Sequence, residues 1–158
     1  MKKIIIIFLL LSYSFIIAKE PRIWLANDYS LHLKGELTMY IDNLYNRIKA
    51  DYKADAGTLE TFYNFGTDSK YYTSSDSGLQ IKTGDLIILF SGLTINCEQK
   101  TYIILIDYFV IDGCNLWAWI SYDNTIFHSE QPEALNSIYD ILNKRIKVYL
   151  NQNKLNEK

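Results

Sequence analysis

Apolar side chains recur every three or four positions in two long stretches of the chain, a spacing typical of amphipathic helices. The first stretch covers residues 33–52, with Ser30 available to cap its first turn. The second begins near Pro132, a residue favoured in the first turn of a helix, and continues to Leu150. We therefore expect a long helix near each end of the domain, followed by polar, frayed residues from 151 to 158.

A shorter helix is predicted over residues 58–66. Thr58 can cap its first turn, and Leu59, Phe62 and Tyr63 fall on one side of it. Gly66 can adopt the left-handed conformation that ends a helix.

Between the helices the apolar period changes from about 3.6 to 2, which indicates strands. Turn residues such as Asp112-Gly113 and Asp123-Asn124 separate the strands at short intervals. Such short connections favour an antiparallel meander, because parallel strands need crossovers of about a dozen residues or more. The sequence therefore predicts an α+β domain, a curved antiparallel β-meander of about five or six strands with N-terminal and C-terminal helices packed on one face. The predicted strands are residues 70–73, 79–82, 86–95, 101–111, 115–122 and 125–128.

The first 18 residues have the pattern of a secretory signal peptide. Lys2 and Lys3 precede an apolar run, and Ala18 is the small residue expected before a cleavage site. Only about 15 residues separate these lysines from the next one, whereas a spanning helix needs about 20, so an uncleaved anchor is the weaker alternative. We expect residues 19–158 to form a single domain that is periplasmic or secreted, with no stable membrane anchor.

The number and distribution of charged side chains limit the classes of partner that are expected. Loss of the two lysines of the signal peptide leaves 14 of the 16 basic side chains against 18 acidic ones, without long runs of one sign. Nucleic acid and anionic lipid both reward clustered Lys and Arg, so neither is expected as the main partner. The 13 Tyr and 3 Trp of the chain belong to the residue types that dominate protein interfaces, which favours another protein as the partner.

The two cysteines, Cys97 and Cys114, suggest a disulfide in an exported protein. A straight strand over residues 101–111 would separate them by about 30 Å, whereas a disulfide requires Cα atoms within about 7 Å. An intramolecular bond therefore needs a strongly bent strand, and an intermolecular bond or two reduced thiols stay open. A zinc site that adds His32 and His128 lacks the short paired spacings of zinc ligands, and no metal or other cofactor is expected.

Motifs for covalent catalysis are weak. Cys114 and His128 would lie about 17 Å apart along the predicted strands, whereas catalytic contact needs about 3 Å. Ser91 and Gly92 follow an apolar strand but lack the flanking glycines of a nucleophile elbow, so a bend in the strand is the simpler interpretation.

One set of residues on the predicted sheet is a candidate site for a ligand or a partner. Alternation along residues 101–111 places Asp107 in an apolar row. A three-residue loop after this strand would set Asp107 opposite Trp119, and a turn at Asp123-Asn124 would set Trp119 opposite His128. The candidate site then consists of Asp107, Trp117, Trp119 and His128.

The alternative for the same residues is a structural role. Tryptophans on a sheet often belong to the core, and Asp107 can hydrogen-bond a neighbouring Tyr or Ser. A two-residue loop would instead set Asp107 opposite Ala118 and break the alignment, because a slip of one residue moves every side chain to the other face.

These features favour a small exported, non-enzymatic binding protein, such as a periplasmic inhibitor or immunity protein that acts on a toxin or hydrolase. The alternative is a small-ligand carrier or a small enzyme with a pocket between sheet and helices, in which Asp107 and His128 are the polar groups. An enclosed cavity that reaches Asp107 would favour the alternative, and an exposed aromatic patch would favour the binding protein.

Overall fold

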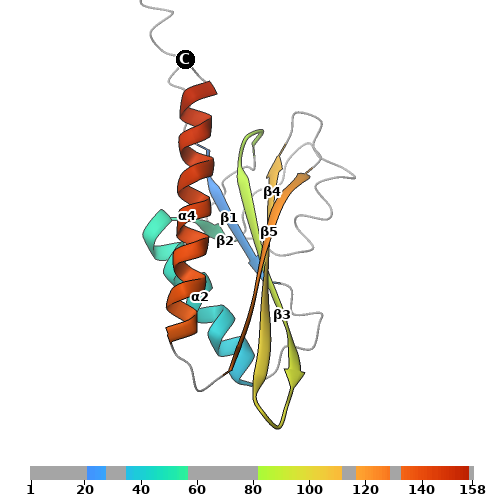
Figure 1. Ribbon diagram of the computed structural model, residues 1–158. Coiled ribbons are helices and arrows are strands. Elements are labelled where there is room, and N and C mark those ends of the chain that lie inside the picture. The colour runs from blue at the N-terminus through green and yellow to red at the C-terminus, as the bar shows by residue number, and fades with distance from the viewer. Residues whose placement is uncertain (1–20, 28–34, 57–81, 112–116, 129–132, 157–158) are drawn as a thin grey trace, which may run out of the picture.

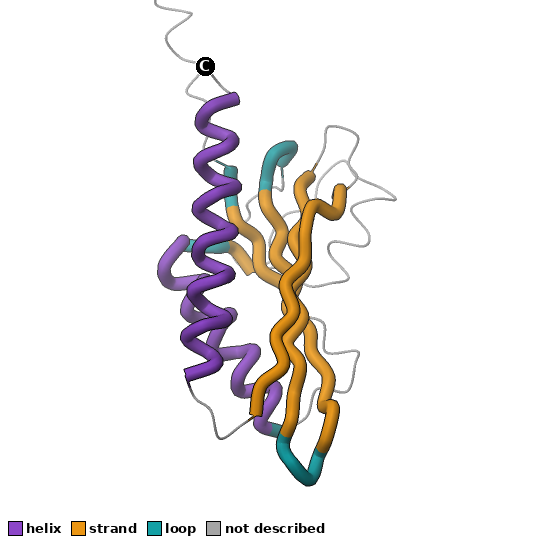
Figure 2. Tube along the Cα trace, in the orientation of Figure 1, coloured by secondary structure: helices purple, strands orange, loops and turns teal. Residues whose placement is uncertain are grey.

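The computed structural model describes residues 21–27, 35–56, 82–111, 117–128 and 133–156. A five-stranded sheet forms one layer, and two helices lie along one side of it (Figures 1 and 2). The α+β class expected from the sequence is confirmed. In chain order the elements are β1 (Ile23–Asn27), α2 (Glu36–Tyr52), β2 (Asp55–Ala56), β3 (Leu86–Asn96), β4 (Thr101–Ile111), β5 (Trp117–His128) and α4 (Glu133–Asn156).

The sheet is mixed, with the strand order β2-β1-β3-β4-β5. Strands β3, β4 and β5 form the predicted antiparallel meander. Strand β1, however, pairs in parallel with both β2 and β3, so the sheet is not antiparallel throughout. Alternation predicts no strand at β1, because its first four residues are all apolar and all buried, as is typical of a strand covered on both faces.

The predicted helices are present with different limits. Helix α2 follows β1, so it is not the first element, and it begins after Gly35, whose φ is 66°. The proposed cap, Ser30, lies outside the described residues. Helix α4 continues to Asn156, six residues beyond the predicted end at Leu150.

The main core fills the space between the helices and the sheet. Helix α2 packs closely on the sheet at Gly92, where an added Cβ would lie 2.7 Å from the carbonyl oxygen of Ile103 and 3.3 Å from Cδ1 of Ile41. Gly92 therefore permits close packing of helix on sheet and needs no bend in β3. The core side chains from the helices are Leu37, Ile41, Leu44, Ile48, Ile138, Leu142 and Ile146, and those from β3, β4 and β5 include Ile88, Phe90, Ile104, Tyr108 and Phe127.

The predicted turn at Asp123-Asn124 is wrong. Strand β5 is continuous over 12 residues and pairs with the whole length of β4, with Asp123 opposite Ile106 and Asn124 opposite Leu105. The predicted strands 115–122 and 125–128 are therefore one strand. The local preference of Asp and Asn for turns is outweighed by the pairing of β5 with β4 and by the contacts of the Asp123 side chain described below.

Several predictions fall on residues that the structure does not describe. They are the signal peptide over residues 1–18, the short helix over 58–66 and the strand over 70–73 together with most of the strand over 79–82. Within the described ranges, neither helix is long and apolar enough to cross a membrane.

Candidate functional site

Both described helices lie on one face of the sheet, and the opposite face, which neither of them covers, is here called the open face (Figure 1). Along β5 the two faces alternate with a period of 2. The open-face side chains from position 122 onward are all exposed, while those between them are partly or fully buried. The exposed set is Tyr122, Asn124, Ile126 and His128.

Exposure on the open face rises from β1 toward β5. One cross-strand row runs from Trp24 through Ile87 and Phe109 to Trp119. Trp24 is only 1% exposed, whereas Trp119 is 55% exposed. Equivalent apolar positions are therefore covered on the β1 side and open to a partner on the β5 side.

Asp107, Trp119 and Tyr122 form a compact group at this open end, here called the aromatic–carboxylate site. Trp119 Nε1 donates a hydrogen bond of 3.1 Å to Asp107 Oδ1. The rings of Trp119 and Tyr122 stack, with centroids 5.8 Å apart and planes 22° apart, and Tyr122 is 53% exposed. The indole N–H is satisfied while both side chains stay more than half exposed, and a carboxylate has lone pairs for further donors.

The structure brings together only part of the predicted site. Asp107 and Trp119 are in contact, but Asp107 pairs with Tyr122 and Trp119 pairs with Phe109. His128 pairs with Thr101 at the far end of β5, and its Nδ1 lies 3.0 Å from Thr101 Oγ1. The predicted pairing of His128 with Trp119 was wrong.

Two features shift the register away from the prediction. Ile111 pairs with Trp117, so the connection between β4 and β5 is longer than the predicted three-residue loop. A bulge then leaves Ile120 without an opposite residue, because Tyr108 pairs with Ser121 and Phe109 with Trp119. The register of β5 places Trp117 on the open face, opposite Ile111, but the Trp117 side chain is not among those that the structure describes.

Tyr122 was missed by the sequence analysis because it precedes Asp123-Asn124, which indicated a turn. Its signal was available in the alternation of Tyr122 with Asn124 and Ile126, which continues one strand through the apparent turn.

The cysteines do not form a described site. Cys97 lies in the turn between β3 and β4 as an exposed, free thiol, and Cys114 lies outside the described residues. Strand β4 runs unbroken over 11 residues, so the bend required for an intramolecular bond is not found there. The disulfide stays a prediction. The part of the chain that is described contains no group of three or more His, Cys, Asp or Glu side chains that could hold a metal.

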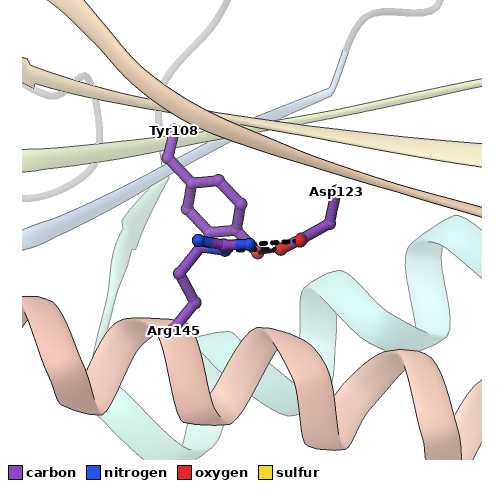
Figure 3. A network of polar contacts seen from close by, with 3 residues as sticks. All are labelled: Tyr108, Asp123 and Arg145. Carbon is purple, nitrogen blue, oxygen red and sulfur yellow. Dashed lines mark hydrogen bonds and ion pairs between the residues drawn. The ribbon is translucent and has the colours of Figure 1, made fainter.

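A second polar group, not predicted from the sequence, joins α4 to the helix-covered face (Figure 3). Asp123 Oδ2 accepts hydrogen bonds from Tyr108 Oη at 2.7 Å and Arg145 Nε at 2.8 Å. Asp123 Oδ1 accepts one from Arg145 Nη2 at 2.6 Å. This bidentate geometry fixes the position of α4 relative to β4 and β5.

The pKa values of this group follow from its contacts. Partial burial alone would raise the pKa of Asp123, but the hydrogen bonds from Arg145 and Tyr108 outweigh it and lower the pKa. Burial, and then the hydrogen bond to Asp123, raise the pKa of Tyr108. Asp123 is therefore ionised and Tyr108 protonated at neutral pH, which suits a structural contact better than proton transfer.

A buried carboxylate also anchors β1. Asp85 Oδ2 accepts hydrogen bonds from Trp24 Nε1 at 2.8 Å and the Lys82 backbone N–H at 2.9 Å. Asp85 Oδ1 accepts one from the Arg22 backbone N–H at 3.1 Å. Three donors satisfy this carboxylate, so it holds β1 against β3 and is not open to a ligand.

Two hollows on the surface lie away from the aromatic–carboxylate site. One, of about 390 Å³, lies beside Arg22, Tyr52 and Lys53. The other, of about 300 Å³, is lined by Ile141, Lys144, Arg145 and Val148 on the flank of α4. Neither includes Asp107 or His128, and the layer between sheet and helices is filled by the main core.

Sequence comparison gives no relative from which a function could be inferred. The chain matches no protein-family model, and no curated protein shows significant sequence similarity to it.

Proposed function

We propose that this protein is a small exported, non-enzymatic binding protein that docks a partner protein through the aromatic–carboxylate site. The observation that carries the proposal is the exposure of two stacked aromatic rings beside a carboxylate, on the sheet face that neither described helix covers. Trp and Tyr are enriched among the residues that contribute most to interface affinity. A periplasmic inhibitor or immunity protein of a toxin or hydrolase is the class that agrees best with the predicted export.

The chemistry of the site favours a basic anchor on the partner. An Arg or Lys side chain can lie against an aromatic ring and pair with Asp107 at the same time. Apolar contact can extend along the row that joins Leu93, Ile103 and Ile126 on the same face. Such an interface would have a charged contact among apolar ones, which gives orientation as well as affinity.

The carrier or enzyme alternative receives less support. It requires a pocket between the sheet and the helices, where the described side chains are closely packed. Its two polar groups, Asp107 and His128, are also separated along the sheet. Asp107 lies opposite Tyr122, whereas His128 lies opposite Thr101 at the end of β5.

A photo-crosslinking amino acid at position 122 of the full chain tests the proposal in the cells that produce it. We expect a defined adduct with one other protein, and we expect Asp107→Asn to abolish it because that change removes the charge while keeping the shape. The same amino acid at Lys147, exposed on α4, is the matched control. An adduct with another protein at position 122 that is no stronger than at position 147, or that survives Asp107→Asn, contradicts the proposal.

Trp119→Ala separates a binding role from a packing role. Loss of an exposed indole should weaken capture of the partner by at least about 30-fold, equivalent to about 2 kcal/mol. It should change the free energy of unfolding by less than about 1 kcal/mol, whereas a core Trp would cost about 3 to 5 kcal/mol. Urea denaturation of both forms provides the second measurement, and large destabilisation would show that Trp119 belongs to the core.

A further inference from the structure

Exposed large apolar side chains gather at one flank of the molecule, where β5 forms the edge of the sheet and α4 lies beside it. Among the residues that the structure describes, six of the nine exposed large hydrophobic side chains belong to these two elements. From β5 they are Trp119, Ile120, Tyr122 and Ile126, and from α4 they are Ile141 and Val148.

Among the described strands β5 lies at the edge of the sheet. It pairs only with β4 there, so the backbone N–H and C=O groups on its other side have no partner in a described strand. Natural edge strands usually carry Lys, Pro or inward charges that prevent pairing. In β5 the only charged residue is Asp123, and Arg145 already neutralises it. The bulge at Ile120 limits regular geometry to residues 121–128.

We propose that two copies of this chain form a dimer by antiparallel pairing of β5 with β5, and that the two-fold axis passes at Asn124. This inference goes beyond the proposed function and does not depend on it. Such a dimer would extend the sheet across both copies and place the helices of both copies on the same side of it.

The side chains of β5 select this register. Residues opposite each other in an antiparallel pair share one face, so the axis must pass at a residue of the strand. An axis at Asn124 sets Tyr122 opposite Ile126 of the second copy and lets the two Asn124 amides hydrogen-bond each other. An axis at Asp123 would oppose two carboxylates, and an axis at Thr125 would oppose Asn124 to Ile126.

Helix α4 supports the same axis independently. Arg145 contacts Asp123, so this part of α4 lies level with the centre of the regular segment of β5. Ile141 and Val148 lie on either side of Arg145 and line the same hollow. Two antiparallel copies would then set Ile141 of one helix opposite Val148 of the other. Lys144 between them is exposed and can keep its ammonium group in water.

The contact would involve both layers of the fold. With the axis at Asn124, residues 121–127 of the two copies pair, which is about 23 Å of strand at about 3.3 Å per residue. The sheet and helix layers together are about 20 Å deep, so Ile141 and Val148 of α4 add to the apolar surface that the paired strands bury.

Light scattering coupled to gel filtration, across a concentration series of the purified chain, tests the proposal. We expect a dimer, and we expect Asn124→Asp to weaken dimerisation by about tenfold or more, because it opposes two carboxylates at the axis. Asn43→Asp adds the same charge to an exposed position of α2 and should leave the dimer unchanged. Val148→Asp should weaken the dimer, whereas Asn151→Asp on the same helix should not. A monomer at every concentration overturns the proposal.

Cysteine crosslinking tests the register in a background with Cys97→Ser and Cys114→Ser. Opposite residues in an antiparallel pair have Cα atoms about 4.5 to 5.5 Å apart, which suits a disulfide. Asn124→Cys should therefore form a covalent dimer under mild oxidation, and Asn43→Cys should not. Tyr122→Cys should crosslink with Ile126→Cys when the two variants are mixed. Crosslinks of Asn124→Cys to a different protein, or none above the Asn43→Cys control, would show that a second copy is not the occupant.

The dimer can be tested independently of the proposed function, so failure of one proposal is distinguishable from failure of the other. Asn124 and Val148 are not part of the aromatic–carboxylate site, so loss of the dimer in their variants leaves partner capture measurable. A photo-adduct from position 122 that has twice the mass of the chain reports the dimer, and any other mass reports a different protein.

Discussion

Phe127 and Ile126 are neighbours on β5, yet Phe127 is 2% exposed and Ile126 is 61% exposed. The difference comes from the face on which each lies. Phe127 packs against Tyr40 of α2, with ring centroids 5.2 Å apart in an edge-to-face arrangement. Ile126 lies on the open face, in the row of Leu93 and Ile103. Apolar character alone therefore does not distinguish the stabilising face of this sheet from the face available for binding.

The polar groups of the two faces differ in the same way. Asp123 on the helix-covered face has both oxygens engaged by Arg145 and Tyr108. Asp107 on the open face accepts a hydrogen bond from the exposed indole of Trp119. The first carboxylate joins two layers of the fold, whereas the second has capacity for a donor from outside.

The largest expected contrast is between Phe127→Ala and Ile126→Ala. Phe127→Ala removes a buried ring and should lower the free energy of unfolding by about 3 to 5 kcal/mol. Ile126→Ala removes a mostly exposed side chain and should change it by about 0.5 kcal/mol or less. Urea denaturation of the two variants gives both values, and equal losses would show that the open face is also part of the core.

Gly92→Ala should have a smaller but clear effect on the helix-covered face. The new methyl group would lie 2.7 Å from a backbone oxygen and 3.3 Å from Ile41, so α2 or β4 must move. Overpacking of this kind costs about 1 to 3 kcal/mol. Ser91→Ala is the neighbouring control on the open face, and a Gly92→Ala variant as stable as the parent would show that α2 does not approach the sheet so closely.

Asp123→Asn tests the ion pair through its pH dependence. The folded state lowers the pKa of Asp123, so the stabilisation is present above the unfolded pKa and is lost as pH falls through the folded pKa. At neutral pH the variant should be less stable by about 1 to 3 kcal/mol. The difference from the parent should begin to decrease below about pH 4, where the carboxyl of the unfolded parent becomes protonated, and should continue to fall as pH passes through the lowered pKa of the folded state. A difference that is constant from pH 7 to about pH 2 would contradict this assignment of the stabilisation to charge.

Much of the fold follows from periodicity along the chain. Strand β4 has the predicted limits, β3 differs by one residue, and the helical period locates α2 and α4 within a few residues. Each of the two helices has one face that contacts the core, so hydrophobic periodicity reports it directly. Strand β3 is buried on both faces over most of its length, and its limits instead follow from the turn residues on either side of it. Strand β1 gives no such signal, because burial on both faces removes the alternation.

The candidate site was only partly predictable, because cross-strand neighbours depend on register. Alternation placed Asp107 and Trp119 on one face, and they are in contact. The bulge at Ile120 and the longer connection before Trp117 replaced the predicted partner of Asp107 with Tyr122. A shift of one residue changes every opposite pair, and no local preference in this sequence indicates where the shift occurs.

The sequence by itself determined the α+β class, the antiparallel order of β3, β4 and β5, and the amphipathic faces of the two helices. These properties depend on patterns within single elements. Only the tertiary structure decided that Asp123 and Asn124 lie within a strand, that Arg145 binds Asp123, and that Trp119 stacks on Tyr122. Each of these depends on contacts between elements. Several hydrogen bonds and a buried surface together contribute more free energy than the local conformational preference of any single residue.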